Sequence, residues 1–129
     1  MNITNALYVL IMSFMFCIGT CSAQEVINQS NFKDKIAKDI VVVEFWAEWN
    51  KANEFAELNK LKDSSVYRVD IMHCSKLQAD YKISAVPTVV VFDNGVEKER
   101  FNANIMFQLE ADKKTIQTSI DTIILNKFQ

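Results

Sequence analysis

The sequence predicts an α/β fold, in which helices pack against a mixed β-sheet. Segments with the apolar pattern of strands alternate with segments in which apolar residues recur at helical spacing. The last two strand segments are joined by Asn-Gly, a strong hairpin signal, and a final amphipathic segment follows them. We expect one α/β sandwich, because no repeat, low-complexity tract or linker divides the chain.

The first residues have the shape of a secretory signal peptide. Residues 1–24 contain no charged side chain, and residues 6–18 are almost entirely apolar. A hydrophobic segment too short to span a bilayer comfortably, followed by small residues up to Ala23, is typical of export. We therefore expect residues 1–23 to be a signal peptide that directs the protein to the periplasm, the extracellular space or a eukaryotic secretory lumen. A buried helix, an uncleaved anchor and a lipid anchor on Cys21 are the alternatives.

The remaining residues, 24–129, suffice for one compact domain. The chain has 14 Lys and Arg against 16 Asp and Glu, without a basic stripe. We therefore expect neither nucleic acid as a partner nor membrane contact after cleavage. Only Cys74 of the three cysteines lies outside the signal peptide, so the domain cannot form an internal disulfide. We expect no cofactor, and one Cys with one His falls short of the ligands typical of zinc.

The domain begins with a short edge strand, Glu25–Asn28. Ser30 is a good N-cap for a helix over Asn31–Lys38, where two apolar residues fall on one face. The next segment, Ile40–Trp46, is nearly continuous in apolar and β-branched residues, which is typical of a strand covered on both faces.

The middle of the domain continues this alternation. Asn50–Lys62 repeats apolar residues at helical spacing, which predicts a long helix. Val66–Ile71 predicts a strand, Ser75–Lys82 a short helix, and Thr88–Asp93 a third buried strand.

The domain ends with a hairpin and a helix. The turn at Asn94-Gly95 leads into a strand over Val96–Phe101. Lys113–Lys127 places its isoleucines on one helical face behind Asp112, a good cap, and predicts a C-terminal helix. Residues 102–110 alternate loosely, and we expect them to prolong the last strand.

Three motifs, in this order, resemble the thioredoxin family over nearly the whole domain. They are VVVEFWAEW at 41–49, Val-Asp at 69–70 and YKISAVPTVVVFDNG at 81–95. The resemblance implies a three-layer α/β/α thioredoxin-like fold with a mixed, mostly five-stranded central sheet.

The family places a reactive Cys-x-x-Cys pair after the second tryptophan, where free amides and the helix dipole stabilise a thiolate. The matching residues here are Asn50 and Asn53, and a carboxamide cannot exchange thiols. We expect Asn50 to cap the helix instead, and hydrogen bonding to a peptide backbone is the alternative. The family's helix-kinking proline is replaced by Leu58, so we expect a straighter helix.

The resemblance also implies a recognition surface. Pro87 matches a proline that the family holds in the cis form, and the backbone before it, at Val86, forms with Trp49 a shallow apolar groove for an extended peptide. For Pro87, a role in shaping the turn into the buried strand is equally open. For Trp49 we favour recognition, because an aromatic side chain at a rim is a typical binding anchor.

Glu44 lies inside an apolar strand, where a carboxylate is costly unless it is paired or protonated. The matching acid in the family exchanges a proton with the second cysteine, a role that Asn53 removes. We expect Glu44 to be structural, either paired with Arg68 on the neighbouring strand or bonded to Asn53.

His73 and Cys74 are adjacent near the same end of the sheet. An imidazole can lower the pKa of a thiol, but adjacent residues of an extended segment tend to point apart. We favour a small inert residue over a reactive or dimer-forming thiol.

Two classes of function follow. We favour an exported protein without the redox dithiol that binds a peptide or protein client and is not an enzyme. The alternative is a thiol–disulfide oxidoreductase with weak or relocated activity through Cys74. A third possibility is a relic scaffold whose contacts lie elsewhere, for instance on Asn102–Glu110. The sequence predicts no oligomeric state.

Overall fold

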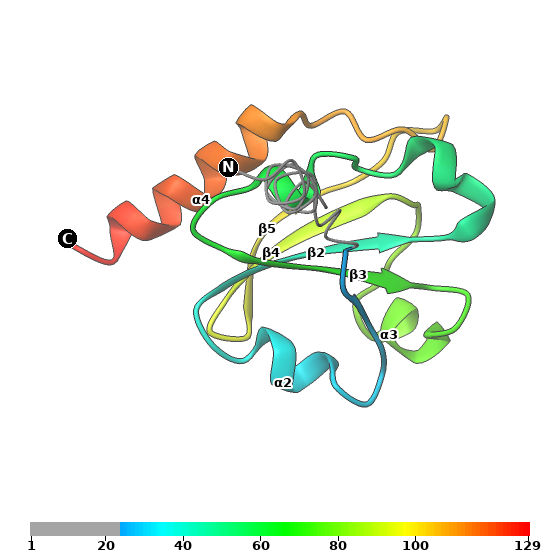
Figure 1. Ribbon diagram of the computed structural model, residues 1–129, viewed down its shortest axis with the longest axis horizontal. Coiled ribbons are helices and arrows are strands. Elements are labelled where there is room, and N and C mark those ends of the chain that lie inside the picture. The colour runs from blue at the N-terminus through cyan, green and yellow to red at the C-terminus, as the bar shows by residue number, and fades with distance from the viewer. Residues whose placement is uncertain (1–23) are drawn as a thin grey trace, which may run out of the picture.

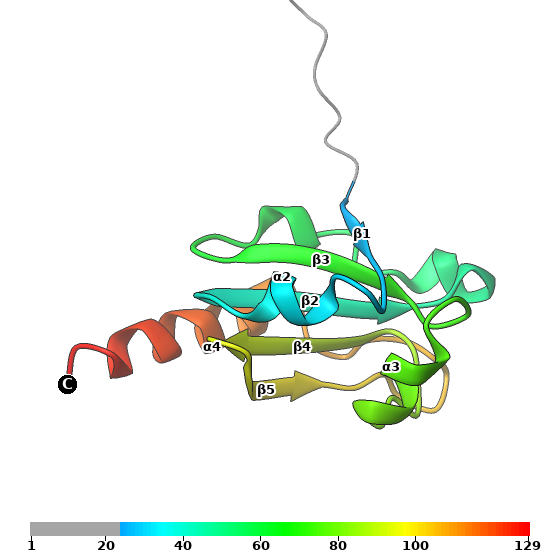
Figure 2. The same ribbon diagram turned by 90° about the horizontal axis from the view of Figure 1, so that it is seen from below.

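The structure is a computed structural model and describes residues 24–129, so the predicted signal peptide lies outside the described residues. The described chain forms one five-stranded sheet with the order β1-β3-β2-β4-β5, as Figure 2 shows from below. Helices lie on both faces of this sheet (Figure 1), which confirms the predicted three-layer α/β/α arrangement.

The sheet is mixed. The strands are β1 (Val26–Ile27), β2 (Ile40–Trp46), β3 (Ser65–Asp70), β4 (Thr88–Asp93) and β5 (Val96–Phe101). The central strand β2 runs parallel to β3 and antiparallel to β4, while β1 is parallel to β3 and β5 antiparallel to β4. The predicted bounds of β2, β4 and β5 are confirmed, whereas β1 is shorter and β3 begins and ends one residue earlier.

The α-helices α2 (Phe32–Ile36) and α3 (Ser75–Asp80) lie on one face of the sheet, and α4 (Lys113–Asn126) lies on the other (Figure 1). Asp112 caps α4 as expected, since its Oδ1 accepts the Thr115 N–H at 2.8 Å. The cap expected for α2 is wrong: α2 begins after Asn31, and the Ser30 hydroxyl donates to Asn28 Oδ1 at 2.6 Å instead. Local side-chain bonds of this kind compete with capping.

The long helix expected over Asn50–Lys62 does not form. Two 3₁₀ helices replace it, η1 (Glu48–Asn53) and η2 (Leu58–Lys60), and Glu54 between them has a ψ of 151°, outside the helical range. Apolar residues in this stretch recur every third residue (Ala52, Phe55, Leu58 and Leu61). That spacing matches the three residues per turn of a 3₁₀ helix better than 3.6. The expectation of a straighter helix at Leu58 therefore fails as well.

The hairpin forms as the sequence predicts. Asn94 and Gly95 have φ values of 49° and 82°, and two positive φ angles are typical of the tight turns that match strand twist. Residues 102–110 do not prolong β5. They fold back on themselves through an isolated bridge between Ala103 and Leu109, and Asn104 Oδ1 accepts the N–H of Met106 at 2.9 Å. We call residues 102–110 the return loop.

The sheet buries a core on each face. Phe32, Phe45, Leu77 and Phe92 belong to the core under α2 and α3. Leu58, Ile116 and Ile120 belong to the core under α4 and η2. Because β2 contributes to both cores, all its residues before Trp46 are buried, as its continuous apolar pattern predicts. Between residues 24 and 129, no helix combines the length and apolar character needed to cross a membrane.

Candidate functional site

The candidate site lies at one end of the sheet. The 3₁₀ helix η1 follows β2 there, the segment before β4 returns to the same end, and the return loop closes over it (Figure 1). The chain order brings these three segments together because β4 runs antiparallel to β2 and therefore begins where β2 ends.

Asn50 joins these three segments through its side chain. Its Nδ2 donates to the Val86 carbonyl and to the Phe107 carbonyl, each at 3.0 Å. Its Oδ1 accepts a hydrogen bond from Asn53 Nδ2 at 2.8 Å. The expected N-cap is wrong, because Asn50 lies inside η1 and no α-helix begins there. Instead, the two residues that match the family's cysteines form a carboxamide cross-link between η1, the segment before β4 and the return loop.

Trp49 and Phe107 form an aromatic pair at the rim of the site. Their ring centroids are 5.3 Å apart and the rings are nearly perpendicular, at 89°. This edge-to-face geometry is favourable for aromatic rings. Trp49 is 58% exposed and Phe107 43% exposed. The rim position expected of Trp49 is therefore present. Sequence reasoning missed Phe107, although the return loop that carries it had the least family-like pattern.

A pocket lies beside this aromatic pair. The Val86–Pro87 peptide bond is cis, as the resemblance implies, and both residues are buried. The pocket has a volume of about 100 Å³ and is lined by Trp49, Ile71, Gln78, Ile83, Ser84, Ala85, Val86 and Phe107. No charged side chain lies in its wall. The predicted groove residues Trp49 and Val86 thus share one hollow, which is closed on one side by a residue of the return loop.

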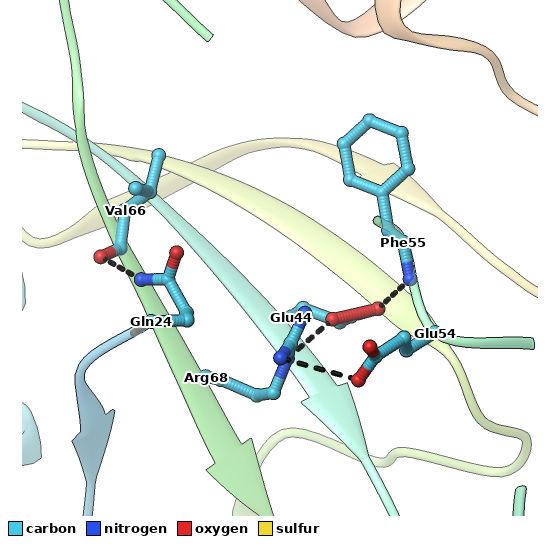
Figure 3. Close-up of polar contacts among 6 residues, drawn as sticks. All are labelled: Gln24, Glu44, Glu54, Phe55, Val66 and Arg68. Atoms are coloured by element: carbon cyan, nitrogen blue, oxygen red, sulfur yellow. Dashed lines mark hydrogen bonds and ion pairs between the residues drawn. The ribbon is translucent and has the colours of Figure 1, made fainter. Parts of the chain in front are cut away.

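Glu44 is fully buried on β2 and is held from two directions (Figure 3). Arg68 Nε donates to its Oε1 at 2.7 Å, and the N–H of Phe55 donates to its Oε2. Arg68 also pairs with Glu54, at 3.3 Å from its guanidinium. Of the two expected partners the structure has Arg68, whereas Asn53 bonds to Asn50.

This cluster anchors the chain that leaves the site. Burial raises the pKa of Glu44 above its ordinary value, while the Arg68 charge and the Phe55 N–H oppose that rise. Arg68 also lies over the Trp46 ring, 5.4 Å from its centre. Because Glu44 and Arg68 bind the backbone of Phe55 and the side chain of Glu54, they fix the path that follows η1.

His73 and Cys74 do not come together as a reactive pair. Cys74 is 5% exposed and packs in the core under α2 and α3. The His73 side chain is 83% exposed, and its Nδ1 lies 2.8 Å from Asp70 Oδ2. The imidazole is thus engaged with a carboxylate rather than with the thiol. Within residues 24–129, no cluster of three or more His, Cys, Asp or Glu side chains could hold a metal ion.

Comparison with known proteins identifies relatives of this chain. A family model described as thioredoxin matches residues 23–120. A thioredoxin from Chlamydia trachomatis is 32% identical over 82 residues, which cover 59% of this chain and 80% of the relative. A thioredoxin from Mycoplasma genitalium is 37% identical over 70 residues, which cover 50% of this chain and 69% of the relative.

Solved structures share the fold. A mutant thioredoxin from Halobacterium salinarum has a TM-score of 0.63 at 24% identity, covering 77% of this chain and 88% of its own. The thioredoxin of Malassezia sympodialis has a TM-score of 0.61 at 26% identity, covering 78% of this chain and 90% of its own. The family match runs from before β1 into α4 and includes every residue of the site.

Proposed function

The chain belongs to the thioredoxin family, and we propose that it is an exported, redox-silent member that binds an extended peptide or a protein client. The observation that carries the proposal is the carboxamide cross-link at the position of the family's dithiol. Asn50 and Asn53 have no sulfur, and the Asn50 amide is already bonded to two backbone carbonyls. Disulfide exchange needs a thiolate that attacks a sulfur atom, and these two side chains cannot supply one.

The remaining thiol supports the same conclusion. Cys74 is buried among apolar side chains and has no contact with His73 that would activate it. Reactive cysteines lie in partly exposed, electropositive surroundings. Redox chemistry through Cys74 therefore requires the chain to open, which makes the relocated oxidoreductase the weaker candidate.

The groove supports binding. An exposed tryptophan at the rim of an apolar hollow is a typical anchor for a partner. Trp49 and Val86 line this hollow, and the buried cis Pro87 directly follows Val86. This arrangement suits a surface that holds a client by contact. Export is proposed from residues 1–23 and is tested by sequencing the N-terminus of the secreted protein, which should begin after Ala23.

Redox silence is tested by reduction of insulin disulfides with dithiothreitol as the electron donor. The purified protein is compared with a Cys74→Ala variant and with a double variant, Asn50→Cys and Asn53→Cys. We expect the parent to add nothing to the rate of dithiothreitol alone and the double variant to accelerate the reaction. Parent activity that disappears in Cys74→Ala would instead identify an enzyme with a relocated thiol.

Client binding is tested by an array of extended peptides probed with the parent, with Trp49→Ala and with Phe128→Ala. Phe128 is 84% exposed and lies at the C-terminal end of the chain, so it is a matched aromatic control. We expect Trp49→Ala to lose the bound peptides and Phe128→Ala to retain them. Equal loss in both variants, or no bound peptide at all, would contradict a groove at Trp49.

A further inference from the structure

We propose that the pocket beside Trp49 accepts one uncharged aliphatic side chain of the client, and that Phe107 sets this selectivity. This inference rests on the proposed binding function and adds to it the chemical class of the anchor residue and the residue that selects it.

The pocket wall excludes charge. Its apolar surface comes from both aromatic rings and from Ile71, Ile83, Ala85 and Val86. Apart from the Trp49 indole N–H, the polar lining side chains are Gln78 and Ser84, and Gln78 directs its Nε2 to the Ile83 carbonyl at 3.5 Å. A Lys or Asp side chain inserted here would lose water without gaining an opposite charge, which is strongly unfavourable. The wall therefore favours an apolar side chain.

The pocket volume then selects among apolar side chains. An apolar cavity of roughly 150 Å³ can hold a benzene molecule. This pocket is smaller, at about 100 Å³. It therefore matches Val, Leu, Ile or Met better than Phe, Tyr or Trp, provided that its walls stay in place.

Phe107 is held in place from several directions. Its carbonyl accepts the Asn50 amide, its N–H donates to the Asn104 carbonyl at 3.0 Å, and its ring meets Trp49 edge to face. Its backbone has a φ of 57°, which is uncommon for a residue with a large side chain. The backbone of this wall is therefore preorganised, and a larger guest would have to displace the Phe107 ring from its contact with Trp49.

The test uses a host peptide of Ser and Thr with capped ends and one central guest residue: Leu, Phe or Lys. Binding to the purified protein is followed by NMR, through the backbone amide signals of Ala85, Val86 and Phe107. We expect Leu to bind at least roughly tenfold more tightly than Lys and several-fold more tightly than Phe, which is the discrimination typical of apolar pockets.

The Phe107→Ala variant removes one wall, and Ile105→Ala is the control on the same loop, because Ile105 is 97% exposed and does not line the pocket. We expect Phe107→Ala to reverse the order of Leu and Phe, and Ile105→Ala to keep it. An unchanged order in Phe107→Ala, or Lys binding as well as Leu, would overturn the selectivity while leaving the binding function intact. Failure of every guest to bind would overturn both.

Discussion

The Asn50 carboxamide donates to the carbonyl of Val86, the residue before the cis proline, at 3.0 Å. The same nitrogen donates to Phe107 in the return loop. Where the family resemblance implies a nucleophile facing its substrate, this chain has a polar group that binds two parts of its own backbone. The site is therefore a fixed surface, and its properties should depend on how firmly Asn50 holds it.

Asn50→Ala should loosen the return loop. The change removes two hydrogen bonds to backbone carbonyls and the bond with Asn53. Neutral hydrogen bonds contribute about 1 kcal/mol each, so we expect a loss of about 1–3 kcal/mol in the free energy of unfolding. Urea denaturation measures this loss, and hydrogen exchange should speed up at the Phe107 and Gln108 amides.

The matched control is Asn53→Ala, which removes only the bond to Asn50 Oδ1 among the hydrogen bonds of this cross-link. Its effect on stability and exchange should be smaller. If exchange in the return loop were as slow in Asn50→Ala as in the parent, the cross-link would not be what holds the loop.

Glu44→Gln should change how stability depends on pH. Burial raises the pKa of Glu44 in the folded protein above its ordinary value of 4.5. Such a group contributes its full stability below that ordinary value, and the contribution is lost as the pH rises through the folded pKa. The free energy of unfolding of the parent relative to Glu44→Gln should therefore fall from acid to neutral pH.

Urea titrations of both proteins across this pH range measure the difference. The comparison cancels the other titrating groups, which are common to both proteins. A parent that is several kcal/mol more stable than Glu44→Gln near neutral pH would mean that the Arg68 ion pair outweighs the desolvation of the carboxylate.

Cys74 should react slowly with thiol reagents in the folded protein. Its side chain is 5% exposed and packs against the core, so a reagent can reach it only when the region opens. We expect labelling by iodoacetamide to be at least about a hundredfold slower than in urea-unfolded protein, because core residues exchange through rare openings. Labelling at the unfolded rate would show that the thiol is accessible and would revive the oxidoreductase candidate.

Gly95→Ala should destabilise the hairpin through its backbone alone. Gly95 has a φ of 82°, and a Cβ placed there would meet no atom closer than 3.9 Å. The expected cost is therefore the strain of a left-handed conformation, about 1–2 kcal/mol, measured by urea denaturation. Glu99→Ala, at an exposed position of the same hairpin, should change stability much less, and equal effects would point to another cause.

The sequence predicts best the strands that are apolar throughout and the tight Asn-Gly turn. Ile40–Trp46 and Thr88–Asp93 are strands with the predicted bounds because burial on both faces demands apolar residues throughout. Asn94-Gly95 forms the predicted turn because few residue pairs tolerate two positive φ angles. These signals are local, or depend on burial alone, and a single sequence carries them.

The sequence predicts less well those features that depend on contacts between segments far apart in the chain. Apolar residues in 50–62 recur every third residue, a spacing that also fits one face of an α-helix. The fully buried Glu44 accepts the Phe55 N–H, which an α-helix would have used for its own hydrogen bonds. Phe107 reaches Trp49 only because the chain reverses at Asn104. Neither the hydrogen bond between Glu44 and the Phe55 N–H nor the chain reversal at Asn104 has a sequence pattern of its own. Only the three-dimensional structure shows them.

The order of the strands has a consequence for how the protein folds. Glu44 in the central strand pairs with Arg68 on one side and with Val89 on the other, and both partners come later in the chain. Contacts between residues far apart in sequence form slowly, because a long loop must close first. Between residues 24 and 88 the helices are short, because two 3₁₀ helices replace a long α-helix, so little local structure is available there to form early. During synthesis the central strand can complete its pairing only after residues 88–93 have emerged, so the chain should remain open until most of it has been made.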